Sequence, residues 1–245
     1  MKREDPPASS VPIIEVNNLC KQFGRRKILN GVNLKVFPGD FLAIFGANGA
    51  GKTTFLKILS TLILPSSGQI SMGGFDLEDD SNEARAQIGL ISHQSYLYSD
   101  LTAYENLRFY GKMFAAPCLE EKISELLELV ELEHRKFDLV GTFSCGMQQR
   151  LSIARALLHD SSILFMDEPY SGLDARASEI LDKVLSGLQQ KNHTFILTTH
   201  DLLKGLEVCS RVAILDKGVI SYQAQKAEID VADFPNIYKK HIEVD

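Results

Sequence analysis

The stretch Phe41-Leu42-Ala43-Ile44-Phe45-Gly46-Ala47-Asn48-Gly49-Ala50-Gly51-Lys52-Thr53 decides the fold. Its first five residues form a continuous apolar run with aromatic ends, which is typical of a strand buried on both faces of a parallel sheet. The next eight match the pattern G-x-x-x-x-G-K-[ST] at every fixed position. From Thr53 to Leu62, apolar side chains recur at helical spacing before Pro65. The sequence therefore predicts a strand, a glycine-rich loop and a helix in direct succession.

The loop at residues 46–53 suits the binding of phosphate groups. Glycines let the backbone bend so that successive amides face phosphate oxygens, and the following helix adds the positive end of its dipole. The Lys52 ammonium can reach the β and γ phosphates, and the Thr53 hydroxyl can ligate Mg²⁺. We therefore predict a site for a nucleoside triphosphate and magnesium. Its candidate residues in this segment are Gly46, Asn48, Gly49, Ala50, Gly51, Lys52, Thr53 and Thr54.

A second apolar run, Ile163-Leu164-Phe165-Met166, ends in Asp167 and Glu168. Two adjacent buried carboxylates cost free energy unless a cation compensates them. We assign Asp167 to holding magnesium through its water shell and Glu168 to polarising an attacking water. His200 ends another apolar strand at its carboxyl end, where ligands bind in open α/β sheets, and is predicted to hydrogen-bond the γ-phosphate. The alternatives are two solvated acids in a loop and a structural histidine.

The rest of the chain predicts the architecture around this site. Strands alternate with helices, which indicates a parallel sheet covered on both faces. The strand-rich start and a hairpin near 68–76 predict an antiparallel β-subdomain. Residues 93–143 have helical patterns without a strand, including the capping-box spacing from Thr102 to Glu105, and predict an inserted helical subdomain. We expect a flexible tail at 1–11 and one domain at 12–245, in which the role of 221–245 stays open.

Composition excludes several classes of protein. The chain has 245 residues, 44% of them hydrophobic, with 26 basic and 32 acidic side chains, giving 26 − 32 = −6. These values are ordinary for a soluble globular protein and unlike disordered, collagen or coiled-coil chains. No apolar run approaches the roughly 18 residues of a membrane span, and the start lacks a secretory signal. The negative charge argues against nucleic acid as a partner. Four unclustered cysteines indicate reduced thiols in the cytosol and no Cys/His metal site.

With these motifs in order, the chain resembles the nucleotide-binding subunit of ABC transporters over nearly its whole length. The most specific feature is Phe143-Ser144-Cys145-Gly146-Met147-Gln148-Gln149-Arg150, which resembles the ABC signature and precedes the strand that ends in two acids. Phe23 matches the aromatic position that stacks on adenine, and Gln94 matches the Q-loop glutamine. Ser171-Gly172-Leu173-Asp174 matches the D-loop, and His200 matches the switch histidine.

The resemblance implies an ABC-cassette fold that hydrolyses ATP with Mg²⁺. Gln94 would act as a catalytic and magnesium-binding residue, together with Lys52, Glu168 and His200. The resemblance also implies a head-to-tail dimer with a second cassette, because one chain has only one copy of each half-site. In that dimer the signature and D-loop residues contact the nucleotide on the partner's phosphate loop; these residues are Ser144, Gly146 and Asp174.

A cassette of this family works with an integral membrane permease on the cytoplasmic face of the inner membrane. Family members dock the permease on the helical block, where Tyr96, Leu97 and Tyr98 would present an aromatic surface or fill the core. Two positions depart from the family pattern. Cys145 replaces the first signature glycine and would be strained only if that position needs a positive φ, and Met147 replaces the usual glutamine.

Within the family, three segments look most like heme-exporter ATPases of cytochrome c maturation: Ile91-Ser92-His93-Gln94, Tyr104-Glu105-Asn106-Leu107 and Phe143-Ser144-Cys145-Gly146-Met147. The resemblance therefore predicts a transport ATPase, with heme export as one candidate role. Two alternatives stay open. One is a soluble ABC ATPase acting on DNA or ribosomes, and the other is a regulatory module that binds ATP without hydrolysing it.

Overall fold

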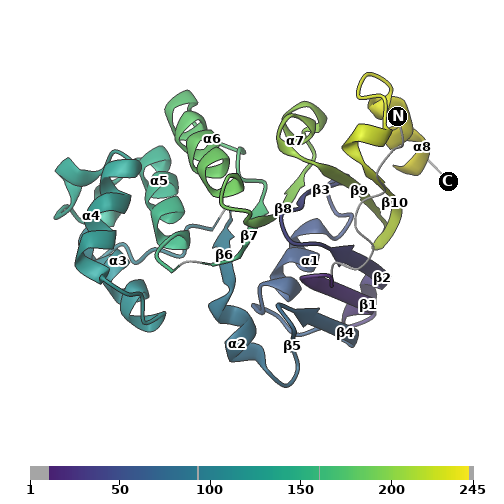
Figure 1. The fold of residues 1–245 in the computed structure, drawn as a ribbon, viewed down its shortest axis with the longest axis horizontal. Helices are drawn as coiled ribbons and strands as arrows, with labels where there is room; N and C mark the ends of the chain where they lie inside the picture. Colours follow the sequence, from purple (N-terminus) through teal and green to yellow (C-terminus); the bar gives the residue numbers. More distant parts are fainter. Residues whose placement is uncertain (1–10, 93, 160, 243–245) are drawn as a thin grey trace, which may run out of the picture.

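The computed structural model describes residues 11–92, 94–159 and 161–242. The tail expected at 1–11 lies outside the described residues except for Val11, which is exposed. Figure 1 shows an elongated molecule with α-helices at one end and antiparallel strands at the other. Among the described residues, no helix is both long enough and apolar enough to cross a membrane.

The central sheet contains the apolar runs of the sequence. In the described part of the chain its order is β10-β9-β3-β8-β7-β6, and all neighbours pair in parallel except β9 and β10. These strands are β3 (Phe41–Phe45), β6 (Ile88–Ile91), β7 (Ile163–Asp167), β8 (Thr194–Thr199), β9 (Arg211–Asp216) and β10 (Val219–Gln225). The predicted parallel sheet is confirmed. The turn at Lys217 and Gly218, both at positive φ, reverses the chain into β10.

Two hydrophobic cores form because alternate side chains of a strand face opposite sides of the sheet. Leu42 and Ile44 of β3 pack on the side of the antiparallel sheet. Phe41, Ala43 and Phe45 of the same strand pack on the opposite side, against helices. Strands buried on both faces have no polar side of their own, which explains the continuous apolar run that opens the phosphate loop.

The antiparallel sheet has the order β2-β1-β4-β5 in the described residues. Its strands are β1 (Ile14–Phe23), β2 (Arg26–Val36), β4 (Ser67–Met72) and β5 (Phe75–Asp76). The hairpin predicted near 68–76 is β4 and β5. Strand β2 stays in the sheet for 11 residues although Gly31 within it has a φ of 74°.

Helices cover both faces of the central sheet. Their bounds are α1 (Lys52–Leu59), α2 (Ser81–Ala86), α3 (Ala103–Met113), α4 (Leu119–Leu129), α5 (Cys145–Ala156), α6 (Ala175–Gln189), α7 (Leu202–Val208) and α8 (Phe234–Ile242), with short 3₁₀ turns at Glu133–Arg135, Val140–Thr142 and Lys226–Glu228. Helix α1 packs between the two sheets, against β2, β7 and β8. Helix α7 packs on β3 and β8, and α8 packs on β9.

The helical part of the molecule follows β6. Helix α3 begins with the predicted capping box, in which the Thr102 side chain accepts from the Glu105 amide and Glu105 accepts from the Thr102 amide. Helices α3 and α4 pack against each other and against α5, the helix of the signature segment. Figure 1 shows these three helices together, away from the antiparallel strands. The signature helix therefore connects the helical part to the sheet.

The segment 221–245, left open by the sequence, ends in a helix that covers the sheet as far as it is described. The ring of Phe234 at the start of α8 is fully buried. It lies 5.1 Å, between ring centroids, from Phe45, the last residue before the phosphate loop. The C-terminal helix thus packs directly behind the strand that presents this loop.

Candidate functional site

The phosphate loop has the geometry that its glycines allow. Gly51 has a φ of 109°, which L side chains rarely adopt, and it caps the start of α1. A Cβ at Gly46 would lie 2.4 Å from the carbonyl oxygen of Leu215 in β9, so only glycine fits there. The loop therefore needs glycine for two different reasons: a left-handed backbone at one position and a close strand at the other.

Lys52 is held inside the loop. Its side chain is only 6% exposed, and its Nζ donates to the carbonyl oxygens of Gly46 at 2.7 Å and Ala47 at 3.2 Å. The same Nζ lies 3.5 Å from Oε1 of Glu168. A buried ammonium needs such partners because it has lost water. Bound phosphate oxygens would replace weaker carbonyl partners with charged ones.

Asp167, the last residue of β7, is 9% exposed. Its Oδ1 accepts two hydroxyl donors, Thr53 Oγ1 at 3.1 Å and Thr198 Oγ1 at 2.7 Å. Thr53 comes from the first turn of α1, whereas Thr198 lies beside Asp167 in the neighbouring strand β8. Three elements distant in the sequence therefore meet at one carboxylate oxygen.

The oxygen atoms of Thr53 and Asp167 are suitable ligands for a magnesium ion. Mg²⁺ prefers hard oxygen ligands and is usually bound by one or two protein oxygens plus waters and phosphates. The Thr53 hydroxyl gives its proton to Asp167 and keeps its lone pairs for a cation. Among the described residues, no cluster of three or more His, Cys, Asp or Glu side chains could bind a metal without the nucleotide. The arrangement therefore suits a cation that arrives with phosphate.

Glu168 lies between two cationic or proton-donating partners. Lys52 is near its Oε1, and Nδ1 of His200 lies 3.0 Å from its Oε2. The Glu168 backbone has a φ of 50°, an uncommon conformation for a residue with a side chain. Its amide donates to the Thr198 carbonyl at 2.9 Å, which fixes this turn to β8. Strained backbone held in this way is frequent at functional sites.

The segment after Glu168 is anchored to the helices behind it. The Tyr170 hydroxyl donates to Oδ1 of Asp182 in α6 at 2.6 Å, and Nζ of Lys204 in α7 lies 4.7 Å from the Tyr170 ring centroid. Burial, followed by the hydrogen bond to Asp182, raises the pKa of Tyr170 well above its usual value. The phenol therefore stays protonated and keeps its donor role at all physiological pH values.

An open cavity of about 280 Å³ lies over the loop. Its lining residues are Arg26, Ile28, Ala47, Asn48, Gly49, Gly51, Lys52, Thr53, Thr54 and Glu168. Most of these were predicted from the sequence. Arg26 and Ile28 were not, because they lie at the start of β2 in a strand with no sequence motif. A Cβ on Gly51 would lie 3.0 Å from the carbonyl oxygen of Ile28, so this strand runs directly beside the loop.

Phe23 and Gln94 are two of the predicted residues that lie outside this cavity lining. Phe23 ends β1 and is 52% exposed, with Nζ of Lys21 4.8 Å from its ring centroid. Gln94 is exposed in the segment after β6, where its carbonyl oxygen accepts from Ser92 Oγ at 2.8 Å. Both have the exposure that a role in contacting nucleotide or a second subunit requires, and these roles stay predictions.

The signature residues form the start of α5. Ser144 caps this helix, and its Oγ accepts from the Met147 amide at 3.3 Å. Cys145 is the first helical residue and does not have a positive φ, so the cysteine at this position is not strained. Asp174 caps α6 by accepting from the Ala177 amide at 2.7 Å. A Cβ at Gly146 would lie 2.7 Å from Oδ2 of Asp174, so the glycine allows this approach.

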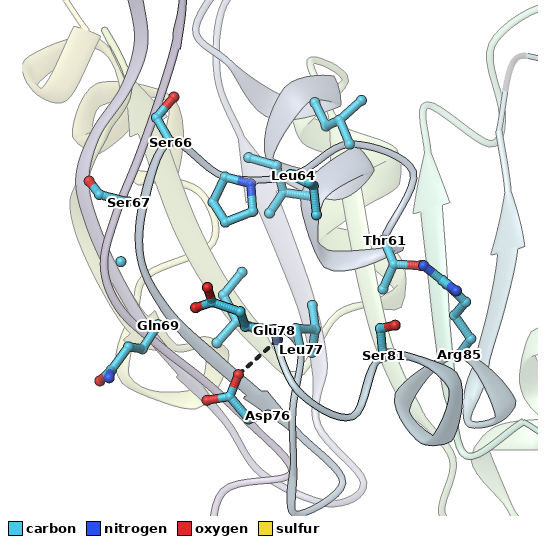
Figure 2. A pocket seen from close by; sticks show the side chains of 15 residues that line it. Thr61, Leu64, Ser66, Ser67, Gln69, Asp76, Leu77, Glu78, Ser81 and Arg85 are labelled. Carbon is cyan, nitrogen blue, oxygen red and sulfur yellow. Dashed lines mark hydrogen bonds between the residues drawn. The ribbon is translucent and has the colours of Figure 1, made fainter.

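A separate hollow of about 370 Å³ lies between the end of α1, β4 and α2 (Figure 2). Leu64 and Leu77 line it together with Glu78, and Nε of Arg85 donates to Thr61 Oγ1 at 2.7 Å at its edge. None of the predicted site residues lines this hollow. This hollow is therefore separate from the predicted site.

The fold and the site define the class of protein. A glycine loop leads from the buried parallel strand β3 into a helix, and its lysine contacts the glutamate that follows β7, two strands away in the same sheet. The carboxyl ends of the parallel strands are where ligands bind in such sheets. This combination defines an α/β phosphate-loop nucleoside triphosphatase.

Comparison with known proteins gives the family. The ABC transporter family model matches residues 29–171. The linearmycin resistance ATP-binding protein LnrL of Bacillus subtilis is 34% identical over 84% of this chain and 67% of its own length. The Nod factor export ATP-binding protein I of Ralstonia nicotianae is 33% identical over 89% of this chain and 70% of its own length.

A solved structure has the same fold. The ATP-binding cassette MJ0796, in a dimeric post-hydrolysis state bound to ADP and Pi, matches with a TM-score of 0.79 and 28% identity over 87% of this chain and 98% of its own. The chain belongs to the ABC transporter family and is an ATP-binding, ATP-hydrolysing subunit. The predicted cassette fold, with its parallel core and antiparallel sheet, is confirmed.

Proposed function

We propose that this chain is the ATPase subunit that drives a substrate through a separate membrane permease from the cytoplasmic face of the inner membrane. The observation that carries the proposal is the position of Glu168, with Lys52 at one carboxylate oxygen and His200 at the other. A glutamate placed between the phosphate-binding lysine and a histidine can orient a water for attack on the γ-phosphate.

The residues of the site have separate roles in phosphate binding, magnesium binding and water activation. The loop amides and Lys52 bind the phosphates, and Thr53 with Asp167 would hold Mg²⁺, which neutralises phosphate charge when bound. When phosphate takes the Lys52 ammonium, Oε1 of Glu168 becomes available for a water molecule. His200, hydrogen-bonded to Oε2, keeps the carboxylate oriented and reaches the γ-phosphate in our assignment. Gln94, in the segment after β6, would complete the set as a further magnesium ligand.

We further propose that two cassettes close on ATP head to tail. The start of α5 presents Ser144 and the amide of Gly146 as an anion site. This chain's own phosphate loop already supplies amides for the phosphates, so the signature site is available for the nucleotide of a second copy. The dimeric state of the similar cassette MJ0796 supports this arrangement. Hydrolysis would remove the γ-phosphate that joins the two halves, and Phe23 would stack on the adenine.

The proposed permease would dock on the helical part. Tyr98, Phe109 and Met113 are large apolar side chains that are 49%, 44% and 59% exposed. The rings of Tyr98 and Phe109 contact each other edge to face, with centroids 5.2 Å apart. Tyr96 is instead half-buried. Exposed apolar clusters of this kind favour a protein partner, and one member of this cluster, Tyr98, follows Gln94 by four residues.

We propose export as the direction of transport. The name of one relative, the Nod factor export ATP-binding protein I, supports this direction. Heme is one candidate cargo, because residues 91–94 and the signature segment resemble those of heme-exporter ATPases. We assign the choice of cargo to the permease, because the described site has the residues for nucleotide and magnesium.

The decisive experiment is purification of the tagged chain from detergent-solubilised membranes. We expect a polytopic membrane protein to co-purify, and ATP hydrolysis by the reconstituted pair to be stimulated by its cargo. Heme and amphiphilic small molecules would be tested in parallel arms. A chain that hydrolyses ATP but recovers only nucleic acid or ribosomes would contradict the transport role. A chain that binds ATP without releasing phosphate would indicate the regulatory alternative.

A further inference from the structure

Thr198 occupies a special place beside the two acids. It is fully buried in β8, and strand pairing sets it directly opposite Asp167 in β7. Its hydroxyl donates to Oδ1 of Asp167 at 2.7 Å. Its carbonyl oxygen accepts from the amide of Glu168 at 2.9 Å. One residue therefore contacts both carboxylate residues of the site, through its side chain on one and its backbone on the other.

We propose that Thr198 is a positioning residue for the magnesium-bound nucleotide, acting through the Asp167 carboxylate. This inference rests on ATP hydrolysis by the chain and is independent of the permease and its cargo. The hydroxyls of Thr53 and Thr198 both donate to Oδ1, so two hydrogen bonds orient the carboxylate. The other oxygen, Oδ2, accepts no hydrogen bond from the described residues and is left for a water of the cation.

The two hydroxyls are not equivalent. The Thr53 hydroxyl must both donate to Asp167 and offer a lone pair to the cation, whereas Thr198 is enclosed in the sheet and has no such second task. A hydrogen bond to a charged group contributes about 1.5–3 kcal/mol. Loss of the Thr198 donor would let the Asp167 side chain rotate and would place an apolar methyl against a buried carboxylate. Both effects weaken metal binding while the phosphate loop stays intact.

The test compares hydroxyl-bearing and hydroxyl-free variants of the full chain. Mn²⁺ is titrated, by electron paramagnetic resonance of the free ion, into protein saturated with a non-hydrolysable ATP analogue. We expect Thr198→Val to weaken Mn²⁺ affinity roughly tenfold and Thr198→Ser to stay within about twofold of the original chain. Analogue affinity measured without metal should be the same in all variants. ATP hydrolysis by Thr198→Val should recover as Mg²⁺ is raised.

Thr194→Val is the matched control. Thr194 lies at the other end of β8, is equally buried, and accepts a hydrogen bond from the Gly39 amide at 3.1 Å. We expect this variant to lose stability without losing Mn²⁺ affinity. If Thr198→Val does not fold, Thr198→Ala and Thr198→Ser decide, because they differ by the same hydroxyl. Equal Mn²⁺ affinities in the hydroxyl-bearing and hydroxyl-free variants would overturn the proposal, as would activity that no magnesium concentration restores.

Discussion

The ammonium of Lys52 lies 3.5 Å from Oε1 of Glu168, so the phosphate-binding lysine and the proposed water-activating glutamate form an ion pair across the nucleotide site. In the proposed mechanism, Lys52 holds Glu168 until phosphate oxygens compete for the Lys52 ammonium. Nucleotide binding and release of the glutamate are one exchange of partners.

Replacing Lys52 by alanine should weaken nucleotide binding itself. The variant loses a charge-assisted contact to the phosphates and leaves Glu168 without its cationic neighbour. We expect ATP affinity to fall by roughly ten- to a hundredfold, measured by calorimetric titration with magnesium present. Lys57→Ala, at a half-buried position at the end of α1, is the control. Unchanged affinity in Lys52→Ala would show that the lysine does not reach the phosphates.

Replacing Glu168 by glutamine should keep ATP binding and trap a closed dimer. The change removes the general base but preserves the size of the side chain. We expect phosphate release to fall by roughly 10²–10⁴-fold and a dimer to accumulate with ATP and magnesium in light-scattering chromatography. Hydrolysis at the original rate would show that Glu168 is not the base. Single particles at every concentration tried, even with the membrane partner, would refute the dimer.

Cys145 and Cys118 are both exposed, but only Cys145 lies in the signature segment. In the proposed dimer the start of α5 faces the partner's nucleotide, so ATP should protect Cys145 from alkylation. The experiment uses the Glu168→Gln variant and counts labelled thiols by mass spectrometry with and without ATP. Cys118, at the start of α4, is the internal reference and should label equally in both conditions. Equal labelling of Cys145 would place the signature helix outside the interface.

The free energy of unfolding should fall at alkaline pH because the buried thiol of Cys209 resists ionisation in the folded chain. Burial raises the pKa of this thiol to about 11. The thiol ionises at lower pH in the unfolded chain, near 8.5, so its contribution to stability is complete below that value. It is lost as pH rises toward the folded pKa, with a slope of up to about 1.4 kcal/mol per pH unit. The free energy of unfolding, measured with urea between pH 8 and 11, should therefore depend less on pH in Cys209→Ala than in the original chain. Parallel curves would contradict this assignment.

Local order in the sequence was enough to predict the phosphate loop, the acid-ended strand and the cap of α3. Each depends on residues close together in the chain: glycines that permit a backbone conformation, an apolar run between two covering layers, or a side chain that reaches an amide three residues away. The positions of Lys52, Thr53 and Asp167 in the structure agree with that reading of the local pattern.

The sequence by itself determined which groups could bind phosphate and activate water, because residue type and local spacing fix those capacities. Only the tertiary structure decided that β8 lies beside β7, which places the hydroxyl of Thr198 on Asp167 and the ring of His200 on Glu168. It likewise brought Arg26 to the loop from a strand without a motif. Hydrophobic periodicity shows that a strand is buried, but the choice of its neighbour is made by the packing of the whole sheet.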